Sequence, residues 1–378
     1  MTDITLQQVS YDLNTLYQRR LALEGFQGLM EGRDVVTGPT ADAMRIALED
    51  ADSDEDGVTG KDLATGVKKV AITVKNIIKW LLRTIGKLVE KLGLGMQKLG
   101  AKNTAVKQAL KSLSEADRSS VSADKPVEAS ALNPAMLCVD GQFVGNDPEQ
   151  VNNAVKMGDY IHQTFPKMFD SILGKVEQLA KTHAADETSE AFFKAFASLL
   201  QSSLVKPDVQ FGSTDVTGDA HDGAIATVPL LGNRGFVMMK PEAASELNSD
   251  RPIEALRQVF TFSFPEYNVD KNVPDEIPGA DIATVTTLST LVDKSVGGIQ
   301  TGESDMKSLI SGRVQSIERV VEELSNKGPG ASGEILEAIG LVLQRFAAVM
   351  TEVESWYMRT MLQELNYLES CVNATPAE

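Results

Sequence analysis

The feature that most constrains the fold is a run of about 37 residues, 332–368, in which apolar side chains recur every three or four positions. This is the period of one face of an α-helix. Two earlier stretches, 282–296 and 304–326, have the same period, and Gly297–Gly298 separates them. Aromatic residues make up only 6% of the chain, so the core must be mainly aliphatic, which also favours helices. We predict a C-terminal helical bundle, 281–378, whose last two helices are antiparallel neighbours.

The middle of the chain, 132–280, is predicted to mix helices with short strands. Asp140–Gly141 lies between two apolar runs and is typical of a type I′ hairpin over 136–144. Residues 224–230 and 235–239 indicate a second hairpin. The fold class is therefore mainly α, a helical bundle with small β-hairpin insertions. Other predicted elements of this region are helices near 148–165, 167–181 and 189–204 and a strand at 261–264.

The first 49 residues, 1–49, are interpreted as a separate leader. A short helix, 41–49, is predicted to close it. The leader has an apolar stripe of its own and no evident need of the later core, so we expect the rest of the chain to stay folded without it. The longer helix before 41–49 is predicted to be of the coiled-coil kind from the spacing of Leu6, Val9, Leu13, Leu16 and Leu23.

An acidic segment, 50–65, follows the leader. Asp52, Asp54 and Asp56, followed by Gly57, match the first positions of a calcium-binding loop. The twelfth position of such a loop needs a carboxylate, and this chain has Leu63 there. A solvated acidic linker is therefore the favoured interpretation, with the three aspartates a weak calcium candidate. No other metal site and no cofactor are predicted.

The next segment, 66–112, is predicted to contain a basic amphipathic helix over 66–99. Residues 58–112 carry twelve Lys or Arg and two acids, a charge of +10 in a chain whose net charge is −17. Such a helix fits a membrane surface, DNA or an acidic partner, or a core helix with a solvated lysine face. A linker, 113–131, follows it. The candidate contacts for DNA or another anion are Lys68, Lys69, Lys75, Lys79, Arg83, Lys87 and Lys91.

Little in the sequence indicates catalysis. The histidines form no cluster with metal-ligand spacing, and nucleophile-elbow, P-loop and dinucleotide motifs are missing. His221–Asp222 in a Gly/Asp-rich loop is a weak catalytic candidate. Cys138 and Cys371 are interpreted as reduced, buried thiols. No run of 18 uncharged apolar residues occurs, so we expect no transmembrane helix. The favoured interpretation is a protein that is not an enzyme.

The leader resembles the propeptides of internal head proteins of phiKZ-like giant phages. The resemblance covers mainly residues 1–50 and 225–240, where Pro229–Gly235 forms a family-like strand turn. It implies a virion protein, assembled in the host cytoplasm and placed inside the capsid, whose leader a prohead protease removes during maturation. The residues that carry it are Ala22-Leu23-Glu24-Gly25, Leu29-Met30-Glu31-Gly32, Thr37-Gly38-Pro39-Thr40-Ala41 and Ile46-Ala47-Leu48-Glu49-Asp50.

The resemblance implies a cut after Glu49, within Ala47-Leu48-Glu49-Asp50. Small residues are commoner than Asp after the cut in these propeptides, so Glu24, Glu31 and Glu128 stay open as alternatives. The implied partners are the prohead core or scaffold, the major capsid protein, the prohead protease and packaged DNA, together with self-association. The leader helix would concentrate the protein in the assembling head, and the cut would release it.

Overall fold

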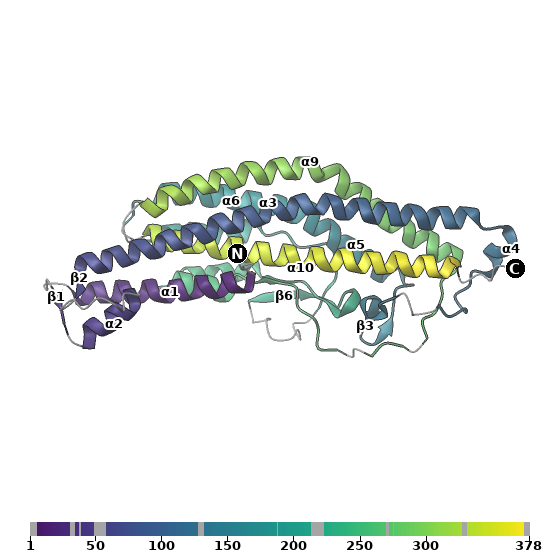
Figure 1. Ribbon diagram of the computed structural model, residues 1–378, viewed down its shortest axis with the longest axis horizontal. Coiled ribbons are helices and arrows are strands. Elements are labelled where there is room, and N and C mark those ends of the chain that lie inside the picture. The colour runs from purple at the N-terminus through teal and green to yellow at the C-terminus, as the bar shows by residue number, and fades with distance from the viewer. Residues whose placement is uncertain are drawn as a thin grey trace.

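Three long helices lie side by side along the longest dimension of the computed structural model (Figure 1). They are α3 (Gly60–Ser112), α9 (Ile282–Asn326) and α10 (Ala331–Asn373). α3 packs against both others, and α9 runs antiparallel to α3 and α10. The predicted mainly helical fold with small strand pairs is confirmed. The structure describes residues 6–30, 35–37, 39–48, 58–127, 132–186, 188–212, 223–269, 272–274, 276–326 and 331–373.

The basic helix α3 is longer at both ends than predicted. Thr59 starts it with a capping box, in which its backbone N–H donates to Asp62 Oδ2 at 2.8 Å and its hydroxyl accepts from the Asp62 N–H. The glycines near its C-terminal end do not stop it, because a buried residue, Val106, continues its apolar face beyond them. That face is part of the core, since Val70, Val74 and Ile78 are buried.

The prediction of two helices between 282 and 326 is wrong, because α9 is continuous. Asp281 precedes it and accepts a hydrogen bond from the Thr284 N–H at 2.8 Å. A glycine in a helix costs only about 1 kcal/mol relative to alanine. Burial of Val296 and Ile299 on either side of Gly297–Gly298 offsets that cost.

The helices of the middle region pack against this bundle, and two of them form one interrupted rod. A π-helical turn, Tyr160–Thr164, joins α5 to α6, with the Phe165 N–H bonded to the Tyr160 carbonyl. Pro166 explains the turn, because proline has no N–H and its ring crowds the preceding turn of a helix. The helices outside the long bundle are α4 (Glu115–Ser120), α5 (Pro148–Asp159), α6 (Phe165–His183), α7 (Glu190–Ser203) and α8 (Pro252–Val259).

The strands are short and antiparallel. Asp140 and Gly141 have φ angles of 49° and 72°, so the predicted turn between β3 and β4 is confirmed. The hairpin of β6 and β7 and the strand near 262 are confirmed as well, within a sheet of order β5-β6-β7-β8. The strands are β1 (Val35–Val36), β2 (Val58–Thr59), β3 (Cys138–Val139), β4 (Gln142–Phe143), β5 (Phe211–Gly212), β6 (Ala224–Thr227), β7 (Val237–Met239) and β8 (Phe262–Ser263).

The leader folds as two helices, α1 (Leu6–Leu29) and α2 (Pro39–Leu48). The leader is not separate from the rest of the chain. α1 packs on α3 and α10, and α2 packs on α1 and α3 (Figure 1). Leu23 and Met44 of the leader are fully buried. They share one hydrophobic cluster with the long helices, so the leader and the body, which is the chain from residue 58 onward, have a common core.

Candidate functional site

The leader lies against the body at two glycines, Gly66 and Gly340. A Cβ on Gly66 of α3 would lie 2.4 Å from Leu48 Cδ2 and 3.3 Å from Leu23 Cδ1. A Cβ on Gly340 of α10 would lie 3.5 Å from a methyl group of Leu13 in α1. A methyl group at Gly66 would force Leu48 to move, whereas one at Gly340 would make an ordinary van der Waals contact with Leu13.

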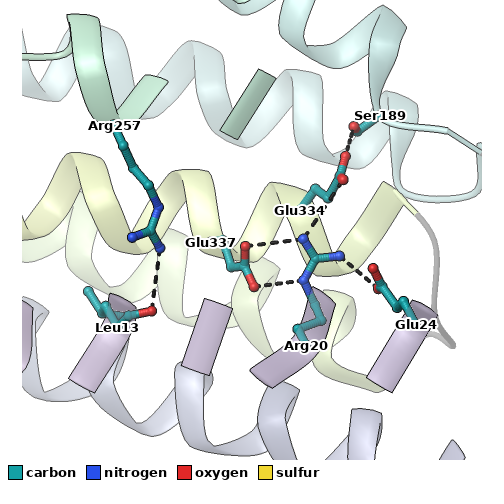
Figure 2. A network of polar contacts seen from close by, with 7 residues as sticks. All are labelled: Leu13, Arg20, Glu24, Ser189, Arg257, Glu334 and Glu337. Atoms are coloured by element: carbon teal, nitrogen blue, oxygen red, sulfur yellow. Dashed lines mark hydrogen bonds and ion pairs between the residues drawn. The ribbon is translucent and has the colours of Figure 1, made fainter. Parts of the chain in front are cut away.

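Between these two points, Arg20 of α1 enters a buried ionic network (Figure 2). Its Nε donates to Glu337 Oε1 at 2.7 Å and its Nη2 to Glu337 Oε2 at 3.2 Å, which is a bidentate pair. Its Nη1 donates to Glu24 at 2.7 Å, and Glu334 lies 3.8 Å from Nη2. The other Glu334 oxygen accepts a hydrogen bond from the Ser189 hydroxyl. The network thus joins α1, α10 and the start of α7.

Burial controls the electrostatics of this network. Both side chains of the Arg20–Glu337 pair are only 4% exposed. Burial disfavours the charged guanidinium, but the Glu337 carboxylate raises the pKa of Arg20 above its ordinary value. Burial raises the pKa of Glu337, and Arg20 opposes that shift. Each charge depends on the other, because an unpaired charge at this depth would be costly.

A second arginine fastens the first half of α1. Arg257 of α8 donates to Asn14 Oδ1 at 2.6 Å and to the Leu13 carbonyl at 3.4 Å (Figure 2 draws the second contact). Its guanidinium lies 4.2 Å from the centre of the Tyr17 ring. Burial, reinforced by Glu254, raises the pKa of Tyr17 to about 12. Arg257 therefore connects α1 to α8.

The sequence reasoning missed both arginines and Glu337. One signal was available for Arg20, since it lies on the apolar stripe of α1 with Leu16 and Leu23 at helical spacing. A charged residue on such a stripe is almost always paired when it is buried. The partner could not be found in this way, because it lies 317 positions further along the chain.

The predicted cut site adjoins the last turn of α2. The carbonyls of Ala47 and Leu48 accept hydrogen bonds from Arg19 of α1 at 2.6 and 2.7 Å. Glu49 and Asp50 lie outside the described residues, as do the alternatives Glu31 and Glu128. The remaining alternative, Glu24, lies within α1 and pairs with Arg20. The calcium candidates Asp52, Asp54 and Asp56 and the pair His221–Asp222 also lie outside the described residues.

The seven anion-contact candidates of α3 fall into groups. Lys75 and Lys79 both pair with Glu322 of α9, at 3.4 and 2.7 Å. The pKa of the Glu322 carboxyl is lowered, and the hydrogen bond from Lys79 makes the largest contribution to this shift. The side chain of Lys91 is not among the described ones. The candidates exposed to solvent are Lys68, Lys69, Arg83 and Lys87.

The family of phiKZ-like phage internal head proteins matches this chain over residues 3–370. The chain belongs to this family. The match spans leader and body alike, and it extends the resemblance beyond the short motifs of residues 1–50 and 225–240. A phiKZ-like internal head protein is a structural protein located inside the phage head. No curated protein and no solved structure matches the chain.

Two further observations bear on the internal head protein. The strand turn that resembles the family, Pro229–Gly235, is built around Gly232 and Asn233, both with positive φ. It joins the small sheet to the bundle, because Trp356 Nε1 donates to the Leu231 carbonyl at 2.8 Å. Among the helices in the described part of the chain, none is long and apolar enough to cross a membrane.

Proposed function

We propose that this internal head protein has a structural role without catalysis, that its leader directs it into the assembling prohead, and that a prohead protease cuts the chain after Glu49. The observation that carries the proposal is the position of the leader's last helix. The described part of α2 reaches Leu48, directly before Glu49. A protease binds its substrate in an extended form, and the end of a helix opens at less cost than its middle. The same argument disfavours Glu24, which lies inside α1.

Arg19 adds a condition to this cut. The protease would have to bind the residues before Glu49 as an extended strand, whereas Arg19 holds the carbonyls of Ala47 and Leu48 in a helical turn. The last turn of α2 must therefore open before cleavage. Arg19→Ala would remove both hydrogen bonds and is expected to speed the cut.

The proposal is tested by replacing Glu49 with Gln in the phage and analysing the protein extracted from purified heads by mass spectrometry. Wild-type protein should begin at residue 50, and Glu49→Gln should keep its leader, because the charge is lost while shape and helix propensity hardly change. Glu24→Gln is the matched control and should be processed normally. A mature N-terminus after Glu24, Glu31 or Glu128 would refute the choice of Glu49, and wild-type heads that contain only the uncut chain, beginning at residue 1, would refute processing.

The proposed partners follow from the same role. The leader would meet the prohead core or scaffold and the major capsid protein during assembly, with self-association as a further contact. Packaged DNA is a second candidate partner, favoured by Lys68, Lys69, Arg83 and Lys87, whose side chains are exposed on α3. The membrane alternative finds no such support, since the apolar face of α3 is buried in the core.

A further inference from the structure

We infer that the leader stays bound to the body after the chain is cut, so that the processed protein is a complex of two chains. This inference rests on the proposed function for its setting. It concerns a binding groove on the body, formed by α3 and α10, whose occupant is this chain's own α1 with α2. The resemblance alone implies release of the leader by the cut. The contacts of the leader indicate retention.

The first reason is the apolar contact. Leu23 and Leu48 of the leader pack over Gly66, and Leu13 lies beside Gly340. Leu13, Leu23 and Leu48 are all buried in the complete chain. Loss of the leader would expose these side chains and the surface of α3 and α10 that they cover, which opposes dissociation.

The second reason is the buried charge. Glu337 has its bidentate partner, Arg20, on the leader, and Glu334 lies near the same guanidinium. A body without its leader would keep these two carboxylates one helical turn apart and lose the arginine between them. In the free body water would solvate both carboxylates, and what the leader supplies is the Arg20 guanidinium, which offsets the repulsion between these two like charges.

The third reason is that contacts of the backbone span the predicted cut. β1, at Val35–Val36, belongs to the leader and β2, at Val58–Thr59, belongs to the body. The two strands pair antiparallel, with Val35 opposite Thr59 and Val36 opposite Val58. A cut after Glu49 would leave this pairing intact, together with the contacts of Arg257 to Asn14 and Leu13.

Cutting the chain changes one contribution to the equilibrium between bound and free leader, the effective concentration of the leader at the groove. The two pieces lose the high effective concentration that the connecting segment provides, so their association comes to depend on protein concentration. None of the apolar, ionic or strand contacts described above requires an intact bond after Glu49. The groove therefore keeps its affinity for the leader, and release needs a further event, such as unfolding or digestion of the leader.

The test uses the full-length protein with residues 50–57 replaced by the recognition sequence of a site-specific protease. After complete cleavage, the leader is expected to co-elute with the body in size-exclusion chromatography without denaturant, and to separate from it in concentrated urea. Mass spectrometry of the eluted fractions identifies both pieces. A wild-type leader that elutes apart from a folded body would overturn the inference.

Substitutions at the Arg20–Glu337 pair test whether the groove between α3 and α10 holds the cut leader. Arg20→Met should weaken binding of the cut leader by about 100-fold or more, because it leaves Glu337 buried without its partner. The double variant Arg20→Met with Glu337→Met should recover most of the binding, since it replaces the ion pair by two apolar side chains. Arg251→Met is the control, because Arg251 is 78% exposed and pairs only near the surface with Glu254. Equal binding by Arg20→Met and Arg251→Met would refute the role of the groove.

The outcome does not depend on the natural protease, since an introduced site is cut. Circular dichroism of the uncut Arg20→Met chain shows whether that variant folds. If heads contain the uncut protein, the proposed processing fails while the groove is still tested by the introduced cut. If heads contain protein cut after Glu49 and the introduced cut releases the leader, only the inference of retention fails.

Discussion

Arg20 Nε lies 2.7 Å from Glu337 Oε1, although the two residues are 317 positions apart in the chain. The pair joins the first helix of the protein to its last one and is almost fully shielded from water. It makes the leader a part of the same core as the body. The proposed cut after Glu49 would therefore remove a covalent link between two parts that pack against each other.

The first prediction concerns the stability of the uncut chain. Replacing Glu337 with Gln leaves the Arg20 guanidinium buried without its bidentate carboxylate, and we expect the free energy of unfolding to fall by about 3–5 kcal/mol. Urea denaturation followed by circular dichroism measures the change. Glu254→Gln, which breaks a pair with the exposed Arg251, should change stability by less than about 1 kcal/mol. Equal effects of the two variants would contradict the importance of the buried pair.

A second prediction compares two glycines of α3. A Cβ at Gly86 would meet nothing within 4 Å, so Gly86→Ala should stabilise the protein by about 0.5–1 kcal/mol through helix propensity. At Gly66 the same methyl group would lie 2.4 Å from Leu48 Cδ2, so the buried Leu48 side chain would have to move. Gly66→Ala should therefore be less stable than Gly86→Ala by about 1 kcal/mol or more in urea denaturation. Two variants of equal stability would show that the close approach of α2 to α3 has no weight.

A third prediction concerns pH and His162. Its Nδ1 donates to the Gly158 carbonyl at 2.7 Å, and burial lowers its pKa from 6.5 to about 4. Above pH 6.5 the ring is neutral in the folded and unfolded states, so its full contribution to stability is present there. As the pH falls from 6.5 towards 4, the unfolded state takes up the proton first and the folded state is destabilised, by up to about 3 kcal/mol.

The measurement for His162 is urea denaturation between pH 7 and pH 4 of the wild type and of His162→Asn. Asparagine keeps a side-chain N–H that can donate to Gly158 and does not titrate in this range. The carboxylates titrate in both proteins, so the difference between the two curves isolates the histidine. As the pH falls, the free energy of unfolding should decrease more for the wild type than for His162→Asn. If the difference in free energy of unfolding between the two proteins does not change with pH, the His162 ring is not neutral and buried as described.

A fourth prediction concerns DNA and the basic face of α3. Changing Lys68, Lys69, Arg83 and Lys87 to Gln should abolish most binding to duplex DNA, because these are the exposed candidates. Each phosphate contact contributes about −0.9 to the slope of log K against log salt, so the slope should become shallower in this variant. Lys75→Gln with Lys79→Gln is the control, since Glu322 already pairs with both lysines. If DNA binding by the wild type does not change with salt concentration, the basic face of α3 is not the DNA-binding surface.

Local patterns predicted most of the helices and turns. The stripe over 332–368 predicted α10, found as Ala331–Asn373, and Asp140–Gly141 predicted the turn between β3 and β4. Both signals act between residues a few positions apart, so they survive in any tertiary context that buries the same face. The break at Gly297–Gly298 was predicted wrongly, because the propensity of a glycine is a small term that burial on either side outweighs.

The candidate site was predictable only in part. The leader helix, the end of the short helix near Glu49 and the basic composition of α3 follow from periodicity and charge. Which lysines of α3 remain exposed does not, because it depends on where Glu322 of α9 lies. The pairing of β1 with β2 was missed as well, since two strands of two residues each carry no recognisable period.

What the sequence determined by itself is most of the helices, their apolar faces and the family to which the chain belongs. Helix formation depends on contacts within one or two turns, and those are written in neighbouring residues. Only the tertiary structure decided that α1 lies against α3 and α10. An apolar stripe does not specify its partner, and the position of α1 depends on the packing of Leu23 over Gly66 and on the ion pair of Arg20 with Glu337. No local rule connects the members of either pair.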